Sequence, residues 1–452
     1  MNNKQIDVLV IGAGAAGIAA SLQLAQAGLS VLMLEARSRI GGRMLTIHDK
    51  ETGAAVELGA EFIHGRPPEI FDILHKHKIR SAEITGDFLR LEHGELQTSD
   101  FFSEVDRLMQ NMTDRGPDES FSDFLDEYCP HKNQEKIKTW ARGYVTGFHA
   151  ADPNLISVHS LVKGMRAEEE IGGHETFRME GGYATLLQIW EQQLRAGNVE
   201  VQLESVVKAV HWKKGGVEVE VAHGEKTSKY TAPKLLVTLP LSLLQAHSKT
   251  KAQTEGVVQF TPELSVKKPA LDKLVMGKVI RVTLSFRERF WNDLHISDIG
   301  GKDSGKTLSD ASFILSGEDW FPTWWTTIPE KLPVITGWAP FHCAERLADK
   351  SPDFVVEKAT QTLANVLRVD AKEVRGLLTS AHYHNWETDP FSQGAYSYVK
   401  VGGDTAQKDL SVPIDETLFF AGEATDYTGH HGTVHAAIRS GHRAAKEILE
   451  NS

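Results

Sequence analysis

The chain has little cysteine, no long apolar run and no excess of positive charge. Its 452 residues include only two cysteines, so no disulfide framework is suggested and a reducing compartment is expected. No run of about 18 or more apolar residues occurs, so we expect no membrane span. The net charge of −12 argues against non-specific binding to nucleic acid. Because 41% of the residues are hydrophobic and 24% are charged, we predict a globular, soluble, cytoplasmic protein.

The first 43 residues carry the most informative pattern. An apolar run at 8–11 is typical of a strand, a glycine-rich turn follows at 12–17, and an alanine-rich helical stretch leads on to Gly28. A second apolar run, at 31–34, ends in Glu35. This order of strand, glycine turn, helix, strand and acid predicts a βαβ unit that binds a dinucleotide.

The residues of the turn have separate physical tasks in such a unit. Gly12 allows the tight turn, Gly14 lets the backbone approach a pyrophosphate, and Gly17 lets the helix pack closely on the strand. Ala15 and Ala16 belong to the start of the helix, where free N–H groups and the positive end of the dipole favour a phosphate.

Glu35 is placed to accept hydrogen bonds from a ribose, and the residues after it separate FAD from a nicotinamide cofactor. Ala36 and Arg37 follow at once, and Gly42 with Arg43 suggests a second backbone approach to the phosphates with a counter-charge. In this segment the chain resembles the FAD-binding proteins of the glutathione-reductase type. Within that group it resembles the flavin amine oxidases.

The flavin amine oxidases include the monoamine oxidases, the polyamine oxidases and the lysine-specific histone demethylases. The resemblance implies an α/β (α+β) fold, in which a Rossmann-like FAD-binding domain is interleaved with a substrate domain of mixed sheet and helices. We therefore predict that both domains are discontinuous. The predicted segments are 1–85, 176–245 and 386–452 for the FAD-binding domain, and 86–175 and 246–385 for the substrate-binding domain.

Periodicity adds local predictions. Valine alternates with polar residues between 199 and 240, which indicates strands with one wet face, and 279–286 also reads as a strand. Helical patterns occur at 353–366 and 434–449, and the segment from about 86 to 175 reads as helical and polar.

The segment near the C-terminus resembles the second FAD signature of the family. Residues 418–421 read as a buried strand, and Gly422 and Glu423 follow it. The resemblance implies that this acid lies by the flavin pyrophosphate and ribityl chain. It also implies that backbone N–H groups at Thr433 and Val434 face the flavin, where the start of the last helix would stabilise negative charge.

Residues 386–398 also match the family closely. The resemblance gives Trp386 a place beside the cofactor and puts Tyr396 at the substrate site, where its π face favours an amine. Monoamine oxidases have a cysteine bonded to FAD where this chain has Ala395, so the FAD is expected to be non-covalent. They also pair the tyrosine with a second aromatic residue, which is Thr433 here.

Arg281 is the sharpest departure from the family pattern. Most relatives have a lysine at this position that holds a water against flavin N5. Lys278 lies three residues earlier and faces the opposite side of a strand, so it cannot substitute. Arg281 either holds the same water or binds an acidic group of the substrate. Arg281 and Tyr396 are the predicted catalytic residues.

The segment 59–65 is expected to run beneath the flavin. His64 stands where plant polyamine oxidases have a glutamate that attracts polyamine cations, and this difference weakens the assignment to polyamines. Further predicted cofactor residues are Gly59, Ala60, Glu61, Phe62 and Val207. The predicted substrate pocket comprises His64, Trp325, Tyr396, His430 and Thr433.

No metal is predicted. His431 and His435 have a spacing that suits a helical metal pair, but no third ligand is evident in the sequence.

We predict an oxidase that takes a hydride from the α-carbon of a small-molecule amine, with FAD as cofactor, molecular oxygen as acceptor and hydrogen peroxide as product. One alternative is an FAD-dependent L-amino-acid oxidase or desaturase of the same superfamily. Another is a flavin-bearing binding protein that has lost its oxidase activity. The hydrophobic tail that anchors mitochondrial monoamine oxidases is absent, so no membrane partner is expected. The chain is either a monomer or a homodimer.

Overall fold

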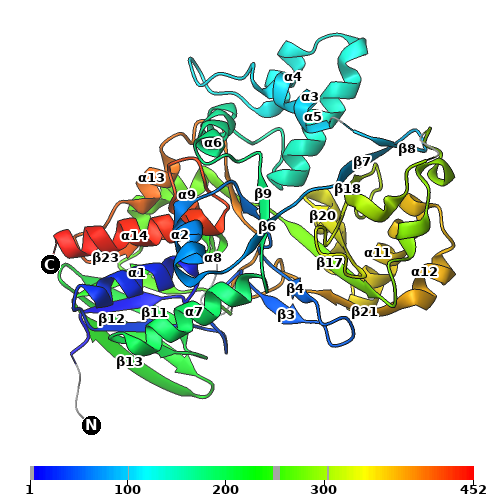
Figure 1. Cartoon of the computed structure of the whole chain (residues 1–452). Helices are drawn as coiled ribbons and strands as arrows, with labels where there is room; N and C mark the ends of the chain where they lie inside the picture. The colour runs from blue at the N-terminus through cyan, green and yellow to red at the C-terminus, as the bar shows by residue number, and fades with distance from the viewer. Residues whose placement is uncertain (1–4, 100, 248–254, 303–304, 452) are drawn as a thin grey trace.

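The computed structural model describes residues 5–99, 101–247, 255–302 and 305–451. Figure 1 shows two lobes that contain sheets, side by side, and a lobe of helices above them. Helices from opposite ends of the chain, α1 (Ala15–Gln26) and α14 (Val434–Glu450), lie together in the first lobe.

The first lobe is built on a five-stranded parallel sheet in the order β10-β2-β1-β14-β23. β1 and β2 are buried along their whole length, as expected of parallel strands that are covered on both faces. The strands are β10 (Val199–Gln202), β2 (Val31–Leu34), β1 (Val8–Ile11), β14 (Lys234–Val237) and β23 (Leu418–Phe420).

Successive residues of β1 enter two different cores. Val8 and Val10 pack with the apolar residues of α1, α14 and α7 (Tyr183–Ala196). Leu9 and Ile11 pack on the opposite face, against a four-stranded sheet. That sheet consists of β13 (Lys226–Ala232), β12 (Gly216–His223), β11 (Val206–Lys213) and β15 (Gln259–Thr261).

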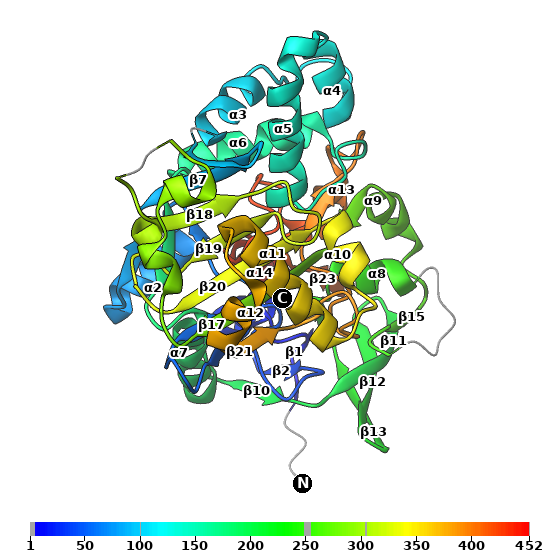
Figure 2. The same ribbon diagram turned by 90° about the vertical axis from the view of Figure 1, so that its right-hand side faces the viewer.

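The second lobe holds a mixed seven-stranded sheet in the order β21-β17-β20-β19-β18-β7-β8. Figure 2 shows α11 (Pro352–Leu367) lying across this sheet, with α10 (His342–Leu347) and α12 (Ala371–Leu377) beside it. The strands are β21 (Leu378–Tyr383), β17 (Val279–Phe286), β20 (Val334–Pro340), β19 (Thr323–Thr326), β18 (Ala311–Leu315), β7 (Asp87–Glu92) and β8 (Glu95–Thr98).

The helical lobe begins later than its sequence suggests. The segment from about 86 was predicted to be helical, but its first residues form the β7–β8 hairpin at the edge of the mixed sheet. His93 and Gly94 take positive φ at the turn, while Leu89 and Leu96 fill the core. The helices that follow are α3 (Phe101–Met109), α4 (Phe121–Tyr128), α5 (Glu135–Phe148) and α6 (Val158–Glu170).

Small sheets and short helices connect the lobes. The sheets pair β3 (Thr46–His48) with β4 (Ala55–Glu57), β16 (Leu274–Met276) with β22 (Ser397–Val399), and β9 (Thr176–Met179) with both β5 (Ile63–His64) and β6 (Ser81–Glu83). The remaining α-helices are α2 (Pro68–His77), α8 (Leu241–His247), α9 (Lys268–Asp272) and α13 (Ala406–Ser411). The exact boundaries of the two predicted domains stay a prediction.

Of the helices in the described part of the chain, none is both long enough and apolar enough to cross a membrane.

Gly441 sets the approach of α14 to α1. A Cβ atom at this position would collide with the backbone carbonyl of Ala16. We therefore expect Gly441→Ala to cost about 1–3 kcal/mol of unfolding free energy through overpacking. Denaturant unfolding measures this cost. Gly376→Ala is the matched control, because it lies in a helix with open space around it and is expected to gain up to about 1 kcal/mol. Equal effects of the two changes would contradict the close packing.

Candidate active site

A cavity of about 940 Å³ extends between the two sheets and the helical lobe. All three lobes contribute to its walls, and almost every residue predicted to bind cofactor or substrate borders it. These residues are Gly12, Gly14, Ala15, Ala16, Glu35, Ala36, Arg37, Gly42, Arg43, Gly59, Ala60, Glu61, Phe62, His64, Val207, Arg281, Trp325, Trp386, Tyr396, Gly422, Glu423, His430, Thr433 and Val434.

The glycines around the start of α1 are of two kinds. Gly12 and Gly17 are needed for the shape of the backbone. Gly12 has a φ of 100°, and an added Cβ at Gly17 would meet the carbonyl oxygen of Gly12. Gly17 does not border the cavity. Gly14 and Gly422 face open space, with no atom within 4 Å of an added Cβ. Bare backbone therefore faces the cavity at the start of a helix, which is the arrangement that a pyrophosphate needs.

Glu35 lies at the end of β2 and already accepts two backbone hydrogen bonds. Its Oε2 is 2.7 Å from the Ala13 nitrogen, and its Oε1 is 2.9 Å from the Arg37 nitrogen. Burial raises the pKa of Glu35 despite these hydrogen bonds. The carboxylate is thus fixed beside the glycine turn, where a ribose hydroxyl could still bond to its remaining lone pairs.

Arg43 is not a free counter-charge. Its Nη1 donates to Oε1 of Glu423 at 3.0 Å and to the carbonyl oxygen of Ala395 at 2.6 Å. The other oxygen of Glu423 accepts hydrogen bonds from Ser397 and from the backbone of Gly432. Glu423 thus connects Arg43, in the segment that follows β2, to the loop before α14.

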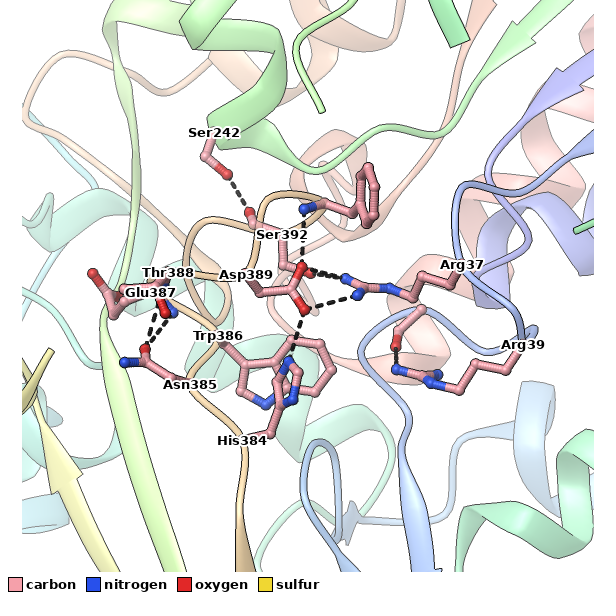
Figure 3. Close-up of polar contacts among 12 residues, drawn as sticks. Arg37, Arg39, Ser242, His384, Asn385, Trp386, Glu387, Thr388, Asp389 and Ser392 are labelled. Carbon is pink, nitrogen blue, oxygen red and sulfur yellow. Dashed lines mark hydrogen bonds and ion pairs between the residues drawn. The ribbon is translucent and has the colours of Figure 1, made fainter. Parts of the chain in front are cut away.

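Arg37 forms a fork with Asp389, as Figure 3 shows. Nη1 and Nη2 each lie 2.7 Å from a different carboxylate oxygen, and Nη2 also donates to Ser392. Burial alone would raise the pKa of Asp389, but hydrogen bonds from His384 and Arg37 hold it well below its ordinary value. The guanidinium lies over the ring of Trp386, so the fork ties the second strand to the segment that follows β21.

Arg281 belongs to a buried charge cluster that borders the cavity. It projects from β17, and its side chain is only 5% exposed. Its Nη2 lies 2.6 Å from Oε2 of Glu61, and its Nη1 donates to the carbonyl oxygen of Gly59. Arg178 and Trp325 also donate to Glu61.

The charge cluster leaves one guanidinium nitrogen of Arg281 unused. Its Nε is buried and has no hydrogen-bond partner among the described residues. Although burial raises the pKa of Glu61, the two arginines lower it overall, so the acid stays ionised beside them. Lys278 is 43% exposed and pairs with Glu345, so it does not reach this site, as the strand periodicity predicts.

Tyr396 and Trp386 are held by hydrogen bonds to backbone carbonyls. The Tyr396 hydroxyl donates to Phe148, and the Trp386 indole donates to Leu58. Burial raises the pKa of Tyr396, so its phenol stays neutral. Thr433 caps α14 by accepting a hydrogen bond from the Ala436 nitrogen.

Histidines line much of the remaining wall, and burial keeps them neutral. It lowers the pKa of His64 to about 4 and that of His149 to about 3, and it also lowers the pKa values of His430, His431 and His435. Within the described part of the chain, Nδ1 of His431 and Nε2 of His435 are buried without a hydrogen-bond partner.

Successive side chains of β19 point to opposite faces of the sheet, one face toward the cavity and the other into the core of the second lobe. Trp325 borders the cavity, whereas Trp324 is fully buried in the core on the other face, together with Phe321.

Some residues of the site have no signal in the sequence. Arg178 and His149 lie in segments without a recognisable motif, and Asp389 lies inside a motif whose match did not give its role. Only the folded chain shows that they pair with, or border, the predicted residues.

In the part of the chain that the structure describes, one group of three side chains comes close enough to share a metal ion. Asp118, His159 and Asp404 place one ligand atom each within 4.8 Å of the others. His159 bonds to Asp404, and Asp118 accepts from the nitrogens of His159 and Gly402. None of the three borders the cavity, and their contacts brace α6 against the segment at 402–404.

Comparison with known proteins relates the whole chain to one family. A model of the flavin containing amine oxidoreductases matches residues 15–449. The chain is 30% identical to lysine-specific histone demethylase 2 of Homo sapiens, over 98% of the chain and 53% of that protein. It is 26% identical to polyamine oxidase 4 of Oryza sativa subsp. japonica, over 97% of the chain and 88% of that protein. The chain spans 53–58% of the length of three of the demethylases it matches.

Solved structures show the same fold. Wild-type putrescine oxidase bound to putrescine superposes with a TM-score of 0.77 over 99% of both chains, at 20% sequence identity. This likeness confirms the predicted α/β fold class, and the family model over residues 15–449 confirms the resemblance on which it was based.

Loss of the Arg37–Asp389 fork is expected to weaken both fold and cofactor binding. Asp389→Asn leaves a buried guanidinium without its anion, so we expect a loss of about 3–5 kcal/mol of unfolding free energy. FAD affinity should fall about tenfold or more, since Arg37 borders the cavity. Thermal unfolding and FAD titration of the apoprotein measure the two effects. Asp310→Asn, which removes an exposed pair with Lys331, is the control and should cost less than about 1 kcal/mol. If both variants behave alike, the fork does not have this role.

Proposed function

The chain belongs to the flavin-containing amine oxidoreductases, its cofactor is FAD, and we propose that it oxidises a small amine with release of hydrogen peroxide. The family match over residues 15–449 supports the proposal. The observation that carries it is that nearly all of the residues predicted to bind FAD and amine border one cavity.

The predicted cofactor residues fit FAD along the length of the cavity. We propose that Glu35 binds the adenosine ribose and that the start of α1 faces the pyrophosphate, with Arg43 and Glu423 between this region and the ring system. FAD bound here would accept a hydride from the amine α-carbon, water would hydrolyse the resulting imine, and oxygen would reoxidise the cofactor. Ala395 has no sulfur, so the cofactor is held without a covalent bond.

The walls favour a neutral amine. Tyr396 and Trp325 offer aromatic faces, and His64 and His149 are uncharged because burial lowers their pKa values to about 4 and about 3. The burial that keeps these histidines neutral also disfavours an ammonium ion, and so promotes the free amine, which is the form that can lose a hydride. The chain's contribution is position, exclusion of water and electrostatics.

The environment of Arg281 supports the water-holding role over the carboxylate clamp. Glu61 already pairs with Arg281, and two of the three guanidinium nitrogens have protein partners. The remaining nitrogen, the buried Nε, carries a single N–H, which suits a neutral acceptor such as water better than a second carboxylate.

Peroxide formation tests the proposed function. The purified protein, supplied with a panel of primary amines, polyamines and amino acids under air, should form hydrogen peroxide and the matching aldehyde in equal amounts with at least one amine. Acid precipitation should release all of the FAD into solution, because no covalent bond holds it. Activity with amino acids alone would instead favour the amino-acid oxidase.

Arg281→Lys distinguishes the two roles of this residue. If Arg281 holds a water, Arg281→Lys should change the rate of flavin reoxidation, by up to about tenfold, while KM stays nearly constant. Stopped-flow mixing of the reduced enzyme with oxygen measures the rate. Arg178→Lys is the control, because Arg178 shares Glu61 but does not border the cavity. It should lower stability and leave reoxidation unchanged. A large rise in KM for substrates with a carboxylate would overturn the water-holding role.

A further inference from the structure

A second cavity lies outside the site described above, and we call it the side cavity. Its volume is about 520 Å³, and its walls come from the start of α11, the last turn of α12, the strand β21 and the residue that follows β4. Figure 2 shows α11, α12 and β21 close together on one side of the second lobe. The side cavity is therefore assembled from segments that lie far apart in the sequence.

Two opposite charges border the side cavity. Asp353 belongs to the first turn of α11, and Arg375 belongs to the last turn of α12. Both are exposed, and neither has an ion-pair or hydrogen-bond partner among the residues that the structure describes. The dipole of each helix accounts for the sign of each charge, but not for the position of both on one cavity without a counter-ion.

The rest of the wall includes apolar surface. Leu58 is buried and also borders the larger cavity, and its carbonyl oxygen accepts the indole N–H of Trp386. The side cavity thus lies next to the proposed reaction site and shares one wall residue with it. The apolar residues that border the side cavity are Leu58, Pro352, Val356 and Ala381.

A buried carboxylate fixes one polar residue of this wall. Asp49 is only 2% exposed, accepts a hydrogen bond from Ser380, and lies 2.6 Å from Nε2 of His382. Although burial raises the pKa of Asp49, the hydrogen bonds from Ser380 and His382 hold it well below its ordinary value, so the carboxylate is ionised. Asp49 lies in the turn between β3 and β4, and it therefore ties this hairpin to β21 and holds the imidazole of His382 at the side cavity.

His382 and Tyr383 bring further hydrogen-bonding groups. Within the described part of the chain, neither Nδ1 of His382 nor the hydroxyl of Tyr383 has a hydrogen-bond partner. Burial raises the pKa of Tyr383, so its hydroxyl stays protonated and able to donate. Both residues border the side cavity, where a polar ligand could use these groups.

One cation, one anion and an apolar surface correspond to the three parts of an amino-acid zwitterion. The planar guanidinium of Arg375 suits a carboxylate, and the carboxylate of Asp353 suits an ammonium group. A simple anion would be repelled by Asp353, and a simple cation would be repelled by Arg375. We propose that the side cavity binds an α-amino acid with an apolar side chain, held as a zwitterion between Arg375 and Asp353. This site is separate from the proposed function, because none of these residues takes part in the oxidation of the amine.

Three ligands that share a six-membered carbon ring test the proposal on the FAD-loaded protein. The zwitterion is 1-aminocyclohexanecarboxylic acid, the anion is cyclohexanecarboxylate, and the cation is 1-methylcyclohexylamine. Neither of the two that contain nitrogen has a hydrogen on the carbon that carries it, so neither can lose a hydride there. Calorimetric titration should show that the zwitterion binds at least about tenfold more tightly than the anion or the cation.

Single substitutions locate the bound zwitterion. Arg375→Met removes the partner of the carboxylate, and Asp353→Asn removes the partner of the ammonium group. Each should weaken binding of the zwitterion by about tenfold or more. Both residues are exposed, so we expect the variants to fold.

Arg195→Met is the matched control. Arg195 is likewise exposed and lies in the last turn of a helix, α7, but it borders neither cavity. The control should leave the affinity for the zwitterion unchanged.

Several results would overturn the proposal. They are failure of the zwitterion to bind the natural chain, equal affinity for the three ligands, or unchanged affinity in Arg375→Met. Tighter binding of the anion than of the zwitterion, with a further gain in Asp353→Asn, would also overturn it, since the side cavity would then be an anion site. The expected binding pattern in a protein that oxidises no amine would support the side cavity and contradict only the proposed function.

Discussion

The cavity depends on buried contacts between arginine and carboxylate that hold residues 35–65 against distant parts of the chain. Each contact crosses from this segment to another segment that is far away in sequence. Breaking one would leave a buried charge without its partner, which is strongly unfavourable, although the net contribution of an intact buried pair to stability is small. The contacts therefore specify position. They are Arg37 with Asp389, Arg43 with Glu423, and Glu61 with Arg281 and Arg178.

Close backbone packing supplies the second constraint. Gly17 fits against the Gly12 carbonyl, and Gly441 fits against that of Ala16, so α1 rests on the glycine turn and α14 rests on α1. This packing brings the loop before α14, with Thr433, to the same cavity as the first turn of the chain. Aromatic residues of the mixed sheet and of the helical lobe border the same cavity.

Much of this fold could be predicted from the sequence, because its strongest signals are local. The turn from Gly12 to Gly17, the strand at 279–286 and the last helix each have a short pattern with one structural solution. The departure at Arg281 was also visible in the sequence, but its partners were not, since Glu61 and Arg178 lie far away along the chain. The β7–β8 hairpin was wrongly predicted as helical, because its short strands are stabilised by pairing with β18. The roles of the site residues stay predictions.

The most direct test of the account is anaerobic titration of the purified protein with an unbranched primary amine, followed through the visible absorption of its flavin. The account predicts that the flavin band disappears as one equivalent of amine is oxidised, and that it returns when oxygen is admitted. A flavin that stays oxidised with every amine would contradict it.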